Sequence, residues 1–200
     1  LASGSLDGGE RTREPAFGLD AWWIEPSMKA RAETMNYTVV DATSVLGTHL
    51  TEVVKQHAAE LLTREEVANL LEQLKAKSPK LVEETVPAVV KPGDLQKILQ
   101  NLLRERIPIR DLETILETLA DWGTKTKDLD VLTEYVRNAL RRAICQIVSS
   151  PSPDGGKSRI VCVTLDPSLE DQINGFIDRT NAGTVVSMPA RVATQIARLI

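Results

Sequence analysis

The run Gly155-Gly156-Lys157-Ser158 is the first group of residues in this sequence that could do chemistry, because a phosphate-binding P-loop ends in Gly-Lys-Ser. Such a loop also needs a glycine five residues before its last glycine, and this chain has Pro151 at that position. A P-loop follows a strand and opens a helix, whereas the pattern here predicts a helix before the run and a strand after it. We therefore interpret the run as part of a flexible linker and predict no nucleotide cofactor.

His49 and His57 are the two histidines of the chain, and they lie eight residues apart on one predicted helix. Two helical turns separate their side chains too widely for both to bind one metal ion, and no HExxH motif supplies further ligands. We interpret both as half-buried polar residues and predict no metal site. Ser44, five residues before His49, is interpreted as the N-cap of the same helix, with Thr43 as the alternative cap.

The acidic residues are placed for helix capping rather than for catalysis, because carboxylates at helix starts and in connections offset the helix dipole. No pair among them has the arrangement that hydrolysis requires. The sequence therefore predicts that the chain is not an enzyme. The residues in question are Glu83, Glu84, Asp94, Asp111, Asp128 and Asp130.

Cys145 and Cys162 are too few for a disulfide scaffold, and neither has a CxxC partner or a nearby histidine cluster. A lone cysteine without such neighbours usually packs as a small apolar side chain. We therefore expect two reduced thiols in the core.

Composition narrows the class of protein further. The chain has 200 residues, of which 42% are hydrophobic, so it can build one or two domains with a real core. Its net charge of -4 argues against general binding to nucleic acid. No apolar run approaches the roughly 18 residues of a membrane span, and no signal peptide is present. The chain begins at Leu1 and ends on an uncapped apolar helical pattern, so we expect a fragment.

The aromatic residues gather near the N-terminus, where Phe17, Trp22 and Trp23 lie within seven positions. Adjacent tryptophans in a strand point to opposite faces, so one of the pair is expected to be exposed and could anchor a protein partner. The pattern predicts a loop or hairpin tail over 1–13 and strands within 14–25 and 37–41. A short helix is expected over 27–35.

Helical spacing of apolar residues begins at Thr43 and continues, with interruptions, to Ile147. One helix is predicted from Thr43 to Leu61, and Thr63 with Glu66 forms a capping box for the next, which Ser78 and Pro79 end. Three more helices are expected after Pro92, from Asp111, and from Asp128 to Ile147.

The stretch 149–158 is dense in Ser, Pro and Gly and is predicted to be a linker. Beyond it, residues 160–165 have the pattern of a buried strand, and Asp166 with Pro167 starts a helix whose apolar face includes Phe176 and Ile177. A second helix is expected from Pro189. The fold class is therefore α+β with several subdomains: small α/β parts at the N-terminus, an all-helical middle domain, and a truncated α/β domain at the C-terminus.

Three runs in this order and spacing resemble one known family: EPAFGLDAWWIE at 14–25, YTVVDATSVLGTHLTEVV at 37–54, and LQNLLRERIPIRDLETILETLADW at 99–122. They are similar to the cytoplasmic domain of the FlhA family, the export gates of the bacterial flagellar type III secretion system. The paralogous export gates of injectisomes are the alternative.

The resemblance implies an organisation into subdomains. Residues 1–41 would be the end of a second subdomain inserted in the first, and 42–62 the returning segment of the first. Residues 63–148 would be the helical third subdomain, 149–158 its linker, and 159–200 the start of a truncated fourth.

The resemblance also implies a site, because family members bind export chaperones carrying cargo in a hydrophobic dimple between the first two subdomains. The matching positions are Glu14, Phe17 and Thr48. The family pattern commonly has Asp where this chain has Glu14, which keeps the charge and lengthens the side chain by one methylene. Implied partners are chaperone-substrate complexes, the export ATPase complex, and eight further copies in a nine-membered ring at the cytoplasmic face of the inner membrane.

A docking platform that passes substrates to the membrane channel is thus the leading hypothesis. A ring-building module without substrate contact is a further alternative. Another is a small-molecule enzyme with its site in the C-terminal α/β domain, although the sequence shows no nucleophile, metal cluster or phosphate loop for such a site.

Overall fold

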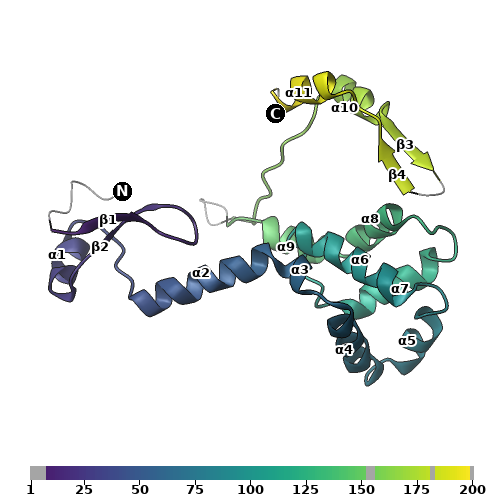
Figure 1. The fold of residues 1–200 in the computed structure, drawn as a ribbon, viewed down its shortest axis with the longest axis horizontal. Coiled ribbons are helices and arrows are strands. Elements are labelled where there is room, and N and C mark those ends of the chain that lie inside the picture. The colour runs from purple at the N-terminus through teal and green to yellow at the C-terminus, as the bar shows by residue number, and fades with distance from the viewer. Residues whose placement is uncertain (1–7, 152–155, 181–182, 199–200) are drawn as a thin grey trace. The chain divides into compact units, whose positions relative to one another are not determined.

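The computed structural model describes residues 8–151, 156–180 and 183–198, and the fold is α+β (Figure 1). The chain divides into two compact units, Leu1–Ala58 and Ala59–Ile200. None of the helices in the described ranges combines the length and apolarity needed to cross a bilayer.

The N-terminal unit starts with an antiparallel hairpin of β1 (Glu10–Arg13) and β2 (Asp20–Trp23). The turn η1 (Pro26–Met28) and helix α1 (Lys29–Thr34) follow, and then the long helix α2 (Ala42–Gln56). The strand in 14–25 and the helix in 27–35 are confirmed. Of the loop or hairpin tail expected over 1–13, residues 1–7 lie outside the described residues, and Glu10–Arg13 form the first strand of the hairpin. The two tryptophans of β2 diverge as expected, since Trp22 meets Tyr37 edge to face at 5.6 Å while Trp23 is 50% exposed.

The predicted strand at 37–41 is wrong, because residues 37–40 are irregular and Asp41 caps α2. Asp41 has extended backbone angles, and its carboxylate accepts hydrogen bonds from the Ser44 amide at 2.9 Å and the Ser44 hydroxyl at 2.7 Å. Neither Ser44 nor Thr43 is therefore the N-cap. The β-branched run before Asp41 has no strand beside it within the described residues, so its propensity is not realised.

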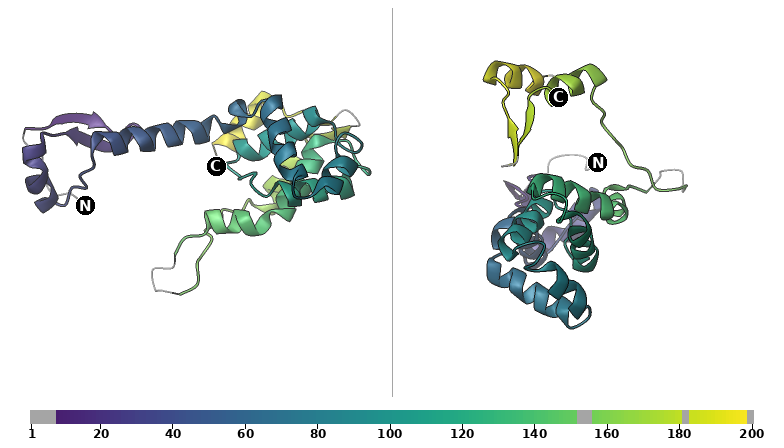
Figure 2. Two further views of the ribbon diagram at one scale, coloured as in Figure 1. Left: turned by 90° about the horizontal axis from the view of Figure 1, so that it is seen from below. Right: turned by 90° about the vertical axis from the view of Figure 1, so that its right-hand side faces the viewer.

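The second unit opens with a bundle of seven helices in its described part (Figure 2). Apolar residues at helical spacing pack one core, in which Leu95, Ile98, Leu99, Ile115, Leu116 and Leu119 are fully buried. The predicted caps are confirmed, since Thr63, Asp111 and Asp128 each accept a hydrogen bond from an amide two or three residues on. The helices are α3 (Ala58–Leu61), α4 (Arg64–Lys75), α5 (Pro79–Thr85), α6 (Pro92–Arg104), α7 (Leu112–Trp122), α8 (Leu129–Ala139) and α9 (Arg141–Val148).

Two of the predicted helices are each divided into two shorter helices in the structure. The helix expected from Thr43 to Leu61 breaks at His57, and the one expected from Asp128 to Ile147 breaks at Leu140, where ψ is near zero. The helix before Ser78 and Pro79 ends at Lys75, in agreement with the prediction. Helix α5 was not predicted; it begins at Pro79, and proline is favoured at the first helical position.

The C-terminal part of the second unit contains α10 (Pro167–Asn174), the antiparallel hairpin of β3 (Ile177–Thr180) and β4 (Gly183–Val186), and α11 (Ala190–Ala197). The cap at Asp166 and the helix after Pro189 are confirmed. The hairpin was not predicted, since Phe176 and Ile177 were assigned to the helix face and α10 ends before them.

The predicted buried strand at 160–165 is wrong. The segment is extended but pairs with no strand in the described residues, and Val161 and Val163 are 90% and 92% exposed. A strand exists only when a neighbour accepts its hydrogen bonds, and sequence pattern alone does not supply one. The predicted linker before it is bridged at its ends, where Ser150 and Arg159 exchange two backbone hydrogen bonds of 2.9 Å.

Candidate docking site

The loop between β1 and β2 carries two of the three predicted site residues, and its backbone is closed on itself. The Glu14 amide donates to the Leu19 carbonyl at 2.8 Å, and the Gly18 amide donates to the Glu14 carbonyl at 2.9 Å. Gly18 has φ of 69°, a left-handed conformation in which a side chain would be strained. Glycine at this position thus allows a tight turn between the strands.

The side chain of Glu14 completes this closure. One carboxylate oxygen, Oε1, accepts a hydrogen bond from the Ala16 amide at 2.8 Å, and the other, Oε2, accepts one from the Phe17 amide at 2.6 Å. Hydrogen bonds to an ionised acceptor are shorter and stronger than neutral ones. The Glu14 carboxylate therefore holds the backbone of Phe17, whose aromatic side chain is exposed.

Phe17 projects from the loop and is 63% exposed, and Leu19 beside it is 64% exposed. Together these two neighbouring side chains form a small apolar surface on the loop. Leu19 was not among the predicted site residues. The signal for it was present in the sequence, because an apolar residue follows Phe17 in a turn that has no core to enter.

Thr48 lies on α2, where its hydroxyl donates to the Ser44 carbonyl one turn earlier at 2.9 Å. In the part of the chain that the structure describes, no hydrogen bond joins Thr48 to Glu14 or Phe17. The structure therefore brings Glu14 and Phe17 together and leaves Thr48 with a local partner.

One face of α2 is apolar and exposed, at the spacing i, i+4, i+7 and i+8. The sequence indicated only the helical spacing of these residues, and in this unit their side chains face solvent. The members are Leu46 at 64%, Leu50 at 60%, Val53 at 37% and Val54 at 46% exposure.

The histidines do not form a metal site. His49 is half-buried in α2, as predicted, while His57 is exposed at the C-cap of the helix, which differs from the prediction. Across the described ranges, no group of three or more His, Cys, Asp or Glu side chains is placed to hold an ion.

Four of the six acidic residues singled out by sequence lie at helix starts, as predicted. Glu83 and Glu84 do not, because they lie within α5, where Glu83 pairs with Lys75 of α4 at 3.2 Å. That ion pair is solvent-exposed and contributes little to stability.

Both cysteines are exposed free thiols, so the prediction of core thiols is wrong. Cys145 lies on the outer side of α9, and Cys162 lies in the unpaired segment 160–165. The prediction failed for Cys162 because it depended on a buried strand that does not form.

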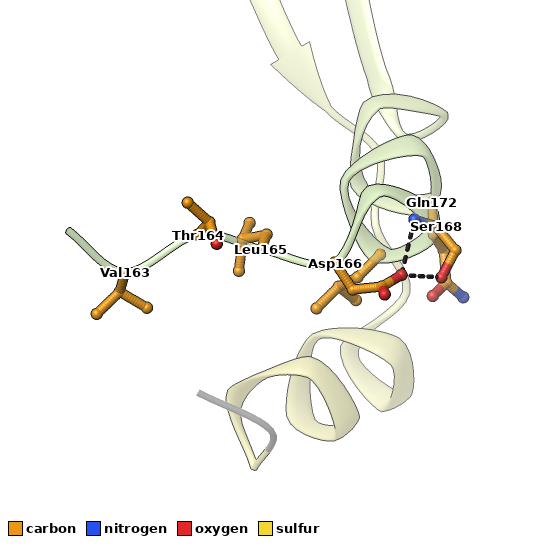
Figure 3. Close-up of a pocket in the computed structure, with 7 residues that line it drawn as sticks. Val163, Thr164, Leu165, Asp166, Ser168 and Gln172 are labelled. Carbon is orange, nitrogen blue, oxygen red and sulfur yellow. Dashed lines mark hydrogen bonds between the residues drawn. The ribbon is translucent and has the colours of Figure 1, made fainter.

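An open pocket lies where the extended segment 163–165 meets α10, and Asp166 is its one ionisable lining residue (Figure 3). The carboxylate is occupied by capping, because it accepts hydrogen bonds from the Ser168 amide at 2.9 Å and the Ser168 hydroxyl at 2.5 Å. The Ser168 hydroxyl is the main cause of a lowered pKa at Asp166. The pocket therefore offers a helix cap and no acid or base free for chemistry.

The run at 155–158 does not have P-loop surroundings. Gly155 lies outside the described residues, and α9 precedes the run instead of a strand. This agrees with the interpretation as a linker.

The arrangement of elements places the chain in the class of the C-terminal domains of type III export gates. Chlamydia pneumoniae CdsV matches with a TM-score of 0.82 and 31% identity, over 94% of this chain and 53% of that chain. CdsV in its complex with CdsO matches with a TM-score of 0.78 and 31% identity, over 89% of this chain and 51% of that chain. The nonameric SctV-C of EPEC matches with a TM-score of 0.69 and 26% identity, over 99% of this chain and 59% of that chain.

The chain belongs to the FHIPEP family, whose model matches residues 2–200. It is 42% identical to the flagellar biosynthesis protein FlhA of Bacillus subtilis over 192 aligned residues. The aligned region covers 96% of this chain and 28% of the relative. It is 47% identical to FlhA of Escherichia coli over 169 aligned residues, and this region covers 84% of this chain and 24% of the relative. The chain spans about a quarter of the length of these relatives. The resemblance to the FlhA family is confirmed.

Proposed function

We propose that this chain is part of a docking platform that receives export chaperones with their bound substrates and passes the substrates toward a flagellar export channel. The observation that supports it most directly is the exposed ring of Phe17 on a loop held by the Glu14 carboxylate. The membership of the chain in a family with flagellar biosynthesis proteins supplies the context.

Docking at this loop needs no bond-making group. Burial of one large apolar side chain contributes roughly 1.5–3 kcal/mol, so a partner that covers Phe17 gains a central anchor. Leu19 widens the apolar surface beside it. Thr48 and Glu14 supply a hydroxyl and a carboxylate for a polar rim. Binding of this kind is reversible, as a hand-over step requires.

The expected setting is the cytoplasmic face of the bacterial inner membrane, in a ring of nine copies that also works with the export ATPase complex. The solved nonameric SctV-C supports the ring, and the solved complex of CdsV with CdsO supports a further protein partner. The subdomain assignment belongs to the same proposal: 1–41 as the end of the second, 42–62 as the return of the first, 63–148 as the third, 149–158 as the linker and 159–200 as the start of the fourth.

The test is a calorimetric titration of the cytoplasmic domain that carries these 200 residues with a cognate flagellar chaperone bound to its cargo. We expect Phe17→Ala to weaken binding at least about tenfold without a change in circular dichroism, because the ring is exposed and makes little contribution to folding. Ile147→Ala is the matched control, since Ile147 is 55% exposed on α9 and lies outside the site. It should bind like the wild type.

Equal binding by Phe17→Ala and the wild type would remove the docking site from this loop. Absence of binding in every variant, together with assembly into a ring, would favour the ring-building module. Binding to injectisome chaperones in preference to flagellar ones would favour the virulence-type export gate.

A further inference from the structure

We propose that Gln96 and Gln100 of α6 form a clamp that holds the short helix α3 on the helical bundle, so that the chain bends between its two units at His57, where α2 ends. The inference goes beyond the proposed function and does not depend on it. It divides the segment 42–62, because α3 at the end of that segment then moves with the bundle.

The hydrogen bonds that α3 receives from α6 are the first argument. A helix of four residues is not stable by itself, and the carbonyl groups at its end have no partners within it. Here Gln100 Nε2 donates to the Ala59 carbonyl at 3.0 Å and to the Leu62 carbonyl at 3.2 Å. Gln96 Nε2 donates to the same Leu62 carbonyl at 2.9 Å. Two side chains of α6 therefore satisfy the carbonyls at the end of α3.

The two glutamines suit this task by their spacing and their chemistry. They lie four residues apart on α6 and so share one face of that helix. A glutamine amide nitrogen carries two hydrogens, and Gln100 has two acceptors for them. The amide is uncharged, so half-burying it costs less free energy than half-burying a lysine ammonium at the same place.

Apolar burial attaches the same residues to the bundle. Ala59 and Leu62 are each 7% exposed, and Leu62 belongs to the core cluster of the bundle. Thr63, the next residue, caps α4 by accepting a hydrogen bond from the Glu66 amide at 3.2 Å. A bend between Leu62 and α4 would therefore break several contacts at once.

His57 has the backbone of a joint. Its amide donates to the Val53 carbonyl at 3.0 Å, which completes α2, and its φ of −103° and ψ of 13° interrupt the helix before α3 begins. The two compact units also divide close to it, between Ala58 and Ala59. Hinges commonly work by a change of backbone angles at a few residues at the end of an element. A bend at His57 breaks none of the hydrogen bonds from Gln96 and Gln100.

The first experiment measures residual dipolar couplings of the backbone amides in the 200-residue chain. Couplings from one rigid body fit one alignment tensor. We expect the couplings of α3 to fit the tensor of α4, α6 and α7, and those of α2 to need a different tensor. A fit of α3 to the tensor of α2 would place the bend after Leu62, and one tensor for α2, α3 and the bundle would mean that the chain does not bend there. Either result would overturn the inference.

Replacement of the glutamines tests the clamp itself. Gln100→Leu removes two of the three hydrogen bonds, whereas Gln96→Leu removes one. We expect chymotrypsin to cleave after Leu61 and Leu62 at least about fivefold faster in Gln100→Leu than in the wild type, because cleavage requires local opening of α3. The increase should be smaller in Gln96→Leu. Gln73→Leu, at an exposed position of α4, is the matched control and should be cleaved like the wild type.

Gln100→Glu is a second variant that keeps the size and polarity of the side chain. At neutral pH its carboxylate can only accept hydrogen bonds and would face two carbonyl oxygens, so α3 should be released at least as strongly as in Gln100→Leu. Cleavage as slow as in the wild type in both Gln100 variants would overturn the clamp. Cleavage that is faster to the same degree at every leucine of the bundle would also overturn it, because the glutamines would then stabilise the whole bundle instead of holding α3.

Discussion

The indole ring of Trp122 lies parallel to the phenol ring of Tyr135, with ring centroids 3.9 Å apart and 11° between the planes. The stack joins the end of α7 to the middle of α8. The Lys125 ammonium lies 4.0 Å from the Trp122 ring centroid and adds a cation–π contact. The stack therefore adds an aromatic contact between two helices that also pack through their apolar residues.

Replacement of Tyr135 by leucine should therefore lower the free energy of unfolding of the helical bundle by about 0.5–1.5 kcal/mol, because leucine keeps apolar area but loses the stack. Urea denaturation followed by circular dichroism measures this. Lys125→Gln, which removes the cation and leaves the rings, should cost about 0.5–1 kcal/mol. A Tyr135→Leu variant as stable as the wild type would show that the stack contributes nothing beyond burial.

Substitution by alanine should have opposite effects on stability at two of the glycines, Gly123 and Gly47. A Cβ at Gly123 would lie 2.8 Å from Val89 Cγ1 and 2.6 Å from the Leu119 carbonyl oxygen, whereas one at Gly47 in α2 would meet nothing within 4 Å. Gly123→Ala should destabilise the bundle by about 1–3 kcal/mol through overpacking. Gly47→Ala should stabilise α2 by about 0.5–1 kcal/mol through helix propensity. Denaturation of the first and native-state amide exchange of the second give the two values, and equal signs would contradict the prediction.

The cysteines give a prediction that separates the structure from the sequence-based expectation. Because Cys145 and Cys162 are both exposed, a thiol reagent such as DTNB should modify two groups per native chain, with no further reaction after denaturation. Cys145→Ser and Cys162→Ser should each remove one. Reaction only after denaturant is added would restore the expectation of core thiols.

The start of α2 should depend on pH through Asp41. The Ser44 hydroxyl, followed by the Ser44 amide, holds the pKa of Asp41 below its usual value of 3.8. A carboxylate whose pKa is lower in the folded chain stabilises the fold fully above the unfolded value, and this contribution disappears as the pH falls through the lower folded value. The first turn of α2 should therefore stay capped at neutral pH and loosen only below about pH 3.8.

Ser44→Ala tests the cause. The pKa of Asp41 should rise back toward its usual range, as measured by the carboxyl ¹³C chemical shift across the titration. Asp166, whose lowered pKa is due to Ser168, is the internal control and should titrate as in the wild type. An unchanged Asp41 titration in Ser44→Ala would assign the shift to something other than this hydrogen bond.

Features of the fold that depend on neighbours in sequence were predictable, and those that depend on distant partners were not. The caps at Thr63, Asp111, Asp128 and Asp166 need only a side-chain acceptor and an amide two or three residues on. The apolar stripe of α6 likewise follows from spacing. The segment 160–165 failed because its β-branched residues indicate extended backbone but not the strand beside it.

The candidate site divides in the same way. Phe17, Glu14 and Thr48 were reached through three sequence runs that resemble a known family, and that resemblance is confirmed. What Glu14 does was not readable, because the sequence does not show that both of its oxygens turn back onto the loop. The cap at Asp41 was missed for a related reason: Asp41, Thr43 and Ser44 are all suitable residue types for an N-cap, and only the backbone geometry shows that Asp41 takes the position.

The exposed run at 160–165 has a consequence for how the protein behaves in a test tube. It combines valines, an isoleucine and a leucine with no charge and no proline, and its backbone hydrogen-bonding groups are not engaged by a described strand. Segments of this kind template intermolecular strand pairing and are the usual origin of aggregation. Concentrated solutions should therefore self-associate through this run, and a single Val163→Lys substitution, which places a charge at the most exposed of its valines, should keep the chain dispersed.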